Sequence, residues 1–155
     1  MRKRVITEGV QEAPETEQDW LNIESIAQAE ITSEDKAHPF EAALVAGGDG
    51  WWAAESGEQT LRLLFDAPLQ LKRIRLIFQE EERQRTQEFV LRWSADGQHY
   101  HDIARQQYNF SSPDSTRELE DYIVDLHGVS ALELTIIPNI SGGSDHASLA
   151  EWSIA

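Results

Sequence analysis

The chain has 155 residues and no cysteine, which excludes disulfide bonds, zinc–thiolate sites and cysteine nucleophiles. Its formal net charge is −15, from 13 basic and 28 acidic side chains, and a surface of that charge repels the phosphate backbone of nucleic acids. Hydrophobic residues make up 40% of the chain, as in a globular protein, and no apolar run is long enough to span a membrane. These values predict a single domain that does not bind nucleic acid.

The N-terminal residues differ in composition from the rest of the chain. The basic start of the chain is not followed by an apolar segment, so we predict no secretory signal. Because the chain also has no cysteine, we predict a cytoplasmic location. From Glu8 to Asp19 the chain is rich in Glu, Gln and Pro and has almost nothing to bury. Residues 1–19 are therefore predicted to form a flexible tail, and residues 20–155 the folded domain.

The first part of the folded domain combines an ambiguous element with a helical turn. Residues 26–32 alternate as a strand, whereas the apolar spacing over residues 20–29 also fits a helix. A helical turn is predicted over residues 40–45, because Pro39 is tolerated at the first position of a helix. The flexible loop Gly47–Gly50 then leads directly into two adjacent tryptophans.

Period-two alternation of apolar side chains predicts a series of short strands after this loop. They cover residues 61–65, 74–78, 89–93, 100–104, 120–126, 132–136 and 149–154. Turns or loops are predicted between them at residues 66–68, 79–84, 111–115 and 141–145. Asp96-Gly97 predicts a tight hairpin, because Asp and Gly tolerate the positive φ of such turns. About eight short strands with hardly any helix predict an all-β antiparallel sandwich.

Several of these segments together resemble a known family. They are the Gly-Asp-Gly loop followed by Trp51-Trp52, the strand end Leu64-Phe65-Asp66, the Pro68 turn, the run LKRIRLIF, and the Ser-x-Asp-Gly hairpin within residues 89–103. In this respect the chain resembles the discoidin family, also called the coagulation factor type C domains, of the galactose-binding-like superfamily. The resemblance covers about residues 27–155 and implies a jelly-roll β-sandwich.

The resemblance also implies a kind of function. Members of this superfamily are usually binding modules for sugars, phospholipid surfaces or other proteins. The sugar binders hold their ligand on loops at one end of the sandwich, with an aromatic platform and Arg, Asn and His donors, often near a structural calcium ion. This sequence departs from the exported members in having no secretion signal and no cysteine pair that ties the termini together.

The candidate ligand-binding residues are aromatic, arginine and amide side chains near the predicted hairpin and after the glycine loop. They are Trp51, Trp52, Arg83, Arg85, Arg105, Tyr108, Asn109 and Phe110. Sugar recognition needs a flat apolar ring and planar hydrogen-bond donors, and this set supplies both. We expect one of the two tryptophans to be buried and the other exposed, because adjacent residues of an extended chain face opposite ways.

The hairpin part of this set has two interpretations. In the first, residues 105–110 form a ligand loop behind the hairpin, and Arg85 and Arg105 lie near the same end of the sheet. In the alternative, Arg83 and Arg85 pair with the acidic run Glu80–Glu82 on the surface, while the two aromatic rings of residues 105–110 fill the core.

Asp49 and Glu151 are candidate calcium ligands, with the carbonyl groups of the glycine loop, if the C-terminal strand passes that loop as in the family. No cofactor is required. The sequence has no nucleophile-elbow pattern and no phosphate loop, so we predict a non-enzymatic protein. The predicted function is a module that binds a carbohydrate or similar polar ligand. The alternative is an intracellular protein-interaction domain that uses the same loops as an adaptor surface.

Overall fold

The computed structural model describes residues 19–155, so the predicted tail lies almost wholly outside the described residues. The elements in chain order are the helix α1 (Ile23–Ile26), the strand β1 (Ala27–Ile31), the 3-10 helix η1 (Phe40–Leu44), and the strands β2 (Trp51–Ser56), β3 (Gln59–Gln79), β4 (Arg85–Ser94), β5 (Tyr100–Phe110), β6 (Arg117–Ile137), β7 (His146–Leu149) and β8 (Glu151–Ile154). All paired strands run antiparallel. The prediction of an all-β antiparallel sandwich is confirmed. No helix in the described part of the chain is long and apolar enough to cross a membrane.

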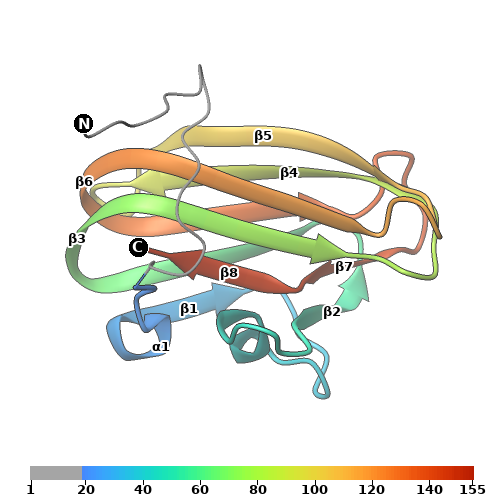
Figure 1. Ribbon diagram of the computed structural model, residues 1–155. Helices are drawn as coiled ribbons and strands as arrows, with labels where there is room; N and C mark the ends of the chain where they lie inside the picture. The colour runs from blue at the N-terminus through green and yellow to red at the C-terminus, as the bar shows by residue number, and fades with distance from the viewer. Residues whose placement is uncertain (1–18) are drawn as a thin grey trace, which may run out of the picture.

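Two long strands organise the sandwich. β3 and β6 have 21 residues each, pair with one another along their length, and double over so that each contributes to both layers (Figure 1). The register shifts between Leu64 and Arg73, where the ribbon bends. The prediction of a turn at residues 66–68 between two separate strands is therefore wrong. Pro68 lacks a backbone N–H and lies at this bend, where β3 doubles over and its regular pairing with β6 is interrupted.

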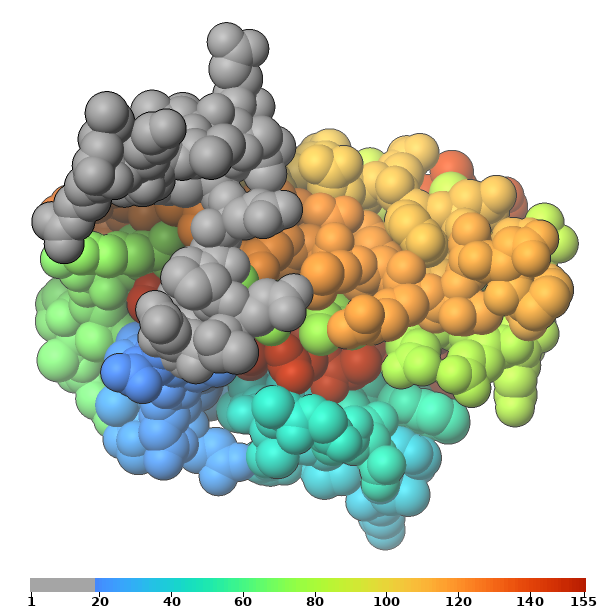
Figure 2. Space-filling view, in the orientation of Figure 1, coloured from blue at the N-terminus to red at the C-terminus, as the bar shows by residue number. Residues whose placement is uncertain are grey.

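The two halves of β3 and of β6 lie in different layers, and the other strands of the sandwich extend one layer or the other. The first layer has the order β1, first half of β3, second half of β6, β4 and β5. The second layer contains β8, the second half of β3 and the first half of β6. Figure 2 shows the second layer from outside, with η1 (teal) against β8 (red). β2 and β7 form a separate two-stranded ribbon.

Alternating apolar side chains fill the space between the layers. Phe78 of one layer stacks on Phe89 of the other, with ring centroids 5.1 Å apart. Phe40 of η1 meets the edge of Trp152 at 6.3 Å, so the predicted helical turn is confirmed and closes the core beside β8. A fully buried side chain of this kind contributes about 1.5–3 kcal/mol relative to an exposed one. Packing between the layers therefore fixes the positions of the loops.

The N-terminal ambiguity and the hairpin are both resolved by the structure. A single helical turn, α1, precedes the strand β1, so each alternative holds for part of the segment.

β4 and β5 form the predicted hairpin. Their connection spans residues 95–99, where only Gly97 has a positive φ. The Asp96 carboxylate accepts hydrogen bonds from the amides of Gln98 and His99. The hairpin prediction is confirmed, with the return strand starting at Tyr100 as expected, and Asp96 stabilises the loop between the two strands.

The two ends of the sandwich differ. Three connecting segments meet at one end, at the right of Figure 1, and we call it the loop end. They are residues 80–84, 111–116 and 138–145. Residues 32–50, which include η1, lie beneath β2 at the bottom of the same view. The opposite end holds the bends of β3 and β6 and the hairpin loop. The loop end is thus the face on which connecting segments are held by rigid strands.

Candidate functional site

β2 carries the two adjacent tryptophans at the loop end. Trp51 is fully buried, and its indole Nε1 donates to the carbonyl oxygen of Ser33 at 3.0 Å. Trp52 points outward and is 50% exposed. The prediction that one tryptophan is buried and the other exposed is confirmed. Trp51 therefore belongs to the core, and only Trp52 is available to a ligand.

Trp52 forms an aromatic platform with residues of the preceding loop. The His38 ring stacks on the indole, with centroids 3.9 Å apart and planes inclined by 5°. Asp35 holds this ring through a contact of 2.8 Å between its Oδ2 and His38 Nδ1. Because His38 covers one face of Trp52 and half of the side chain remains exposed, the opposite indole face is open. We call Asp35, His38 and Trp52 the aromatic platform.

Backbone hydrogen bonds fix the platform in place. The Trp52 amide donates to the carbonyl oxygen of His38 at 3.2 Å, and the Asp35 amide donates to that of Trp52 at 2.8 Å. The sequence did not indicate His38 or Asp35, because these bonds join segments 14 or more residues apart. The exposed tryptophan was the only local signal of this site.

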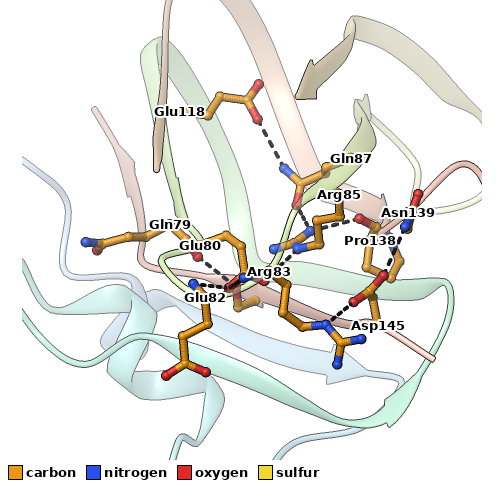
Figure 3. A network of polar contacts seen from close by, with 11 residues as sticks. Gln79, Glu80, Glu82, Arg83, Arg85, Gln87, Glu118, Pro138, Asn139 and Asp145 are labelled. Carbon is orange, nitrogen blue, oxygen red and sulfur yellow. Dashed lines mark hydrogen bonds and ion pairs between the residues drawn. The ribbon is translucent and has the colours of Figure 1, made fainter. Parts of the chain in front are cut away.

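Arg83 lies on the loop between β3 and β4, and 61% of its side chain is exposed. The Glu80 carboxylate orders this loop by accepting hydrogen bonds from the amides of Glu82 and Arg83 (Figure 3). Arg83 Nε lies 2.8 Å from Asp145 Oδ1, and the Asn139 amide donates to the other oxygen of that carboxylate at 3.0 Å. The guanidinium is therefore held at the surface with most of its edge open to solvent.

The strand β7 relates Arg83 to the aromatic platform. Trp52 pairs with Ser148 of β7, and the Ser148 hydroxyl donates to the carbonyl oxygen of Gln79, at the start of the Arg83 loop. Asp145, the partner of Arg83, lies three residues before Ser148, which is roughly 10 Å of extended chain. Arg83 and the platform thus lie on opposite sides of one short strand at the loop end.

Arg85 is buried and holds structural elements together. Its side chain reaches Glu80 Oε1 at 2.8 Å, Gln87 Oε1 at 3.2 Å and the Pro138 carbonyl oxygen at 2.9 Å (Figure 3). The guanidinium also lies 4.8 Å from the ring centroid of Phe110, which is fully buried. The pairing of Arg85 with the acidic run is therefore correct, but it is buried rather than on the surface. Neither Arg85 nor Phe110 is accessible to a ligand.

The remaining candidates lie along β5, not in a ligand loop. Arg85 pairs with Phe110 and Val90 with Arg105, so Arg105 lies five residues, or roughly 17 Å, from the loop end. The prediction that Arg85 and Arg105 share one end of the sheet is wrong, as is the predicted loop over residues 105–110. The half-buried Tyr108 donates its hydroxyl to the Arg117 carbonyl oxygen at 2.9 Å. Asn109 is exposed at the edge of the sheet.

A buried carboxyl group lies beneath this network. Gln87 donates to Glu118 Oε1 at 3.1 Å, and Glu118 is only 2% exposed. Burial and the neighbouring carboxyl group of Glu120 raise the pKa of Glu118 to about 8. The Tyr122 hydroxyl donates to Glu120 at 2.8 Å, and burial raises the pKa of Tyr122. This paired carboxyl group lies between the layers, where a polymeric substrate has no access to it.

The two segments that carry the candidate calcium ligands lie against each other. A Cβ atom added at Gly50, whose φ is +80°, would lie 2.7 Å from the Leu149 carbonyl oxygen, so the glycine loop does lie against the C-terminal segment. Asp49 and Glu151 flank this close approach, and Glu151 accepts a hydrogen bond from the Ser153 hydroxyl at 3.3 Å. Residues 19–155 contain no group of three or more Asp, Glu, His or Cys side chains arranged to hold a metal ion. A calcium ion here would need backbone carbonyl ligands, which suits a hard cation.

Comparisons with known proteins place the fold. No protein-family model matches the sequence, and no curated protein matches it. Among solved structures, CpGH89CBM32-5 from Clostridium perfringens, in complex with GalNAc-β-1,3-galactose, is similar with a TM-score of 0.62 and 16% identity over 88% of this chain and 99% of that chain. The family 32 carbohydrate-binding module from C. perfringens NanJ, in complex with galactose, has a TM-score of 0.62 and 14% identity over 87% of this chain and 96% of that chain. A pectin-binding carbohydrate-binding module has a TM-score of 0.58 and 22% identity over 83% of this chain and 89% of that chain.

These neighbours establish the architecture of the chain. They are carbohydrate-binding modules of the discoidin-like, galactose-binding-like type. With the layers and strand order described above, the protein has this β-sandwich fold, as the sequence resemblance implied. At such low identity the likeness concerns the fold, so the function must be argued from the site.

Proposed function

We propose that the protein is a non-catalytic carbohydrate-binding module whose sugar ligand stacks on the open face of Trp52. The observation that carries this proposal is the aromatic platform, in which His38 backs an indole that is half exposed at the loop end. An aromatic ring fixed on one side and open on the other offers a flat apolar surface at little cost in side-chain freedom. That is the surface which the C–H face of a sugar ring requires.

Polar groups around the platform supply hydrogen bonds to sugar hydroxyls. His38 keeps its second ring nitrogen free of hydrogen bonds to any described residue, because Asp35 engages only Nδ1. Arg83 adds an exposed guanidinium on the other side of β7. A mixed set of ring, imidazole and guanidinium groups suits polyhydroxyl ligands, since each hydroxyl can both donate and accept.

The preference among sugars follows from the charge of the chain. A net charge of −15 disfavours uronic acids at long range, whereas neutral and basic sugars meet no such repulsion. The neighbours themselves include both kinds of ligand: galactose and GalNAc-β-1,3-galactose in the modules from C. perfringens, and pectin or an unsaturated mannuronic acid in two others, so the preference rests on the charge of this chain. We therefore expect galactose-type or amino sugars to bind more tightly than galacturonic acid. A non-catalytic role agrees with these neighbours and with the burial of Glu118 between the layers.

The experiment is isothermal titration of the protein with galactose, N-acetylgalactosamine, glucosamine and galacturonic acid. Covering the open half of the indole removes about 100 Å² from water, which corresponds to about 2 kcal/mol, or roughly thirtyfold in Kd. Trp52→Ala is therefore expected to weaken binding by that factor, and Trp52→Phe by much less. Leu119→Ala is the matched control, because Leu119 is an equally exposed apolar residue on another surface, with 51% exposure.

Two results would contradict the proposal. If a sugar binds and Trp52→Ala leaves its Kd unchanged, the platform is not the site. If no sugar of the panel binds and the protein instead retains a stoichiometric protein partner from its native lysate, the adaptor function replaces the carbohydrate function.

A further inference from the structure

Two cavities adjoin one another away from the aromatic platform. The first, of about 260 Å³, lies at the loop end between Gly57 and the segment from Pro138 to Asp145. The second, of about 280 Å³, lies on the outer face of the five-stranded layer. Glu58 and Ile137 line both, so the two cavities adjoin, and together we call them the sheet groove, which leads from the loop end onto the sheet. Each cavity is slightly smaller than the roughly 300–1,000 Å³ of typical ligand sites.

The floor of this sheet groove is formed by the central strands. Thr60 of β3, Thr135 of β6 and Val90 of β4 lie side by side in the strand register. Val90 is 7% exposed, and the two threonine hydroxyls lie 3.4 Å apart. The floor thus combines methyl groups with hydroxyls. None of the residues lining either cavity is aromatic.

Charged side chains form the walls and are held by ion pairs. Arg105 lies 3.5 Å from Glu88. Arg92 lies 2.7 Å from Asp102 and 3.6 Å from Glu133. These contacts hold two guanidinium groups beside the floor, so less rotational freedom is lost when a ligand binds.

A charge ladder closes the groove on one side. Five residues lie directly opposite one another on five neighbouring strands, and their charges alternate: Glu30, Arg62, Glu133, Arg92 and Asp102. Four ion pairs connect them, at 3.4, 2.7, 3.6 and 2.7 Å. Opposite charges in facing positions stabilise a sheet, and here they also fix the direction of the arginine that lines the groove.

The electrostatics of the groove differ from those of the whole protein. Arg105 pairs with Glu88, Arg92 with Asp102 and Glu133, and Arg83 with Asp145, so the acidic side chains in and beside the groove are largely offset by arginines and only a small negative charge remains, whereas the chain as a whole carries −15. A neutral, hydroxyl-rich ligand is not repelled by that charge and finds both donors and acceptors. A peptide is disfavoured, because it would bind by adding a strand to a sheet edge, whereas this groove crosses the face of central strands.

We propose that the sheet groove is a second ligand site that binds a linear, uncharged oligosaccharide. From Thr135 to Asn139 the groove follows four residues, roughly 13 Å of extended chain, which is longer than a single sugar ring. The ligand lies from the sheet towards the loop end and is held through its hydroxyl groups rather than by stacking. Because Trp52, His38 and Asp35 do not line the groove, its occupancy is independent of the aromatic platform.

The test is an NMR titration of backbone amides with xylohexaose, cellohexaose and mannohexaose as probes and their monosaccharides as references. At least one hexasaccharide is expected to shift the amides of Thr60, Arg105 and Ile137, while the monosaccharides do not. The double variant Glu58→Ala/Arg105→Ala removes two exposed polar groups of the wall and should weaken this binding about tenfold. Trp52→Ala should leave it unchanged.

The matched control is Glu55→Ala/Arg117→Ala, which removes the same charges from exposed positions outside the groove. The proposal is overturned if no hexasaccharide shifts the groove amides. It is also overturned if the shifts persist in the double variant and vanish in Trp52→Ala, because the ligand would then occupy the aromatic platform. The experiment can therefore refute oligosaccharide binding in the groove without refuting sugar binding on the aromatic platform, and the reverse.

Discussion

Replacing the buried acid Glu118 by its amide should stabilise the protein at neutral pH. The carboxyl group accepts a hydrogen bond from Gln87 and is 2% exposed, and burial beside Glu120 raises its pKa to about 8. At pH 7 it is therefore protonated in the folded protein and ionised in the unfolded chain. Glu118→Gln keeps the shape and the acceptor for Gln87 but has no proton to lose.

The size of this stabilisation follows from the pKa of Glu118 in the unfolded and in the folded protein. Its ordinary value is 4.5 and its folded value about 8, so its contribution to stability is complete below pH 4.5 and is lost as the pH rises to 8. The loss is about 1.4 kcal/mol per pH unit between these limits. Between pH 4.5 and pH 7 the free energy of unfolding of the native protein thus falls by about 3 kcal/mol because of Glu118. In Glu118→Gln the side chain does not titrate, so it causes no such fall.

Urea unfolding at pH 4.5, 7 and 8 measures this difference directly. The two proteins should have similar free energies of unfolding at pH 4.5, and the variant should be more stable by about 3 kcal/mol at pH 7. Asp114→Asn, on the exposed turn before β6, is the control and should follow the native profile. Parallel profiles of the native protein and Glu118→Gln would refute the raised pKa. A variant less stable than the native protein at pH 7 would show that Glu118 is ionised and paired with Arg85.

Two further predictions concern residues of the candidate sites. Arg85→Met leaves Glu80 and the Pro138 carbonyl oxygen without their buried partner, so the free energy of unfolding should fall by about 3 kcal/mol while sugar affinity stays unchanged. A loss of affinity without a loss of stability would instead make Arg85 a ligand contact. If Asp49 and Glu151 bind calcium, the ion at 100 times its Kd should add about 2.7 kcal/mol and raise the Tm by several degrees, and Glu151→Gln should abolish the rise. An equal Tm with calcium and with EDTA in the native protein would exclude the site.

The local patterns of the sequence predicted the elements that depend on local chemistry. The hairpin of β4 and β5, the turn η1 and the opposite directions of Trp51 and Trp52 all follow from alternation or from residues suited to turns. The continuity of β3 could not be predicted in the same way. Residues 66–68 have the composition of a turn, but pairing with β6 on both sides keeps the chain in one strand through the bend.

The candidate site was predicted only in part, because it depends on register and long-range contacts. Trp52 was found from its position after a glycine loop, whereas its partner His38 is placed by backbone hydrogen bonds to β2. Arg83 and Arg85 look equivalent in sequence, yet one lies on a loop and the other points into the sandwich. Arg105 was assigned to the wrong end because the length of β5 was not apparent from the pattern.

The central claim, that Trp52 is the sugar platform, can be tested by NMR of the indole N–H groups. The chain has five tryptophans, and the buried Trp51 and Trp152 serve as internal controls. During titration with galactose or N-acetylgalactosamine, we expect the Trp52 indole signal to move until binding is saturated, while those of Trp51 and Trp152 stay in place. Saturable binding of a sugar that leaves the Trp52 signal unmoved would contradict this claim.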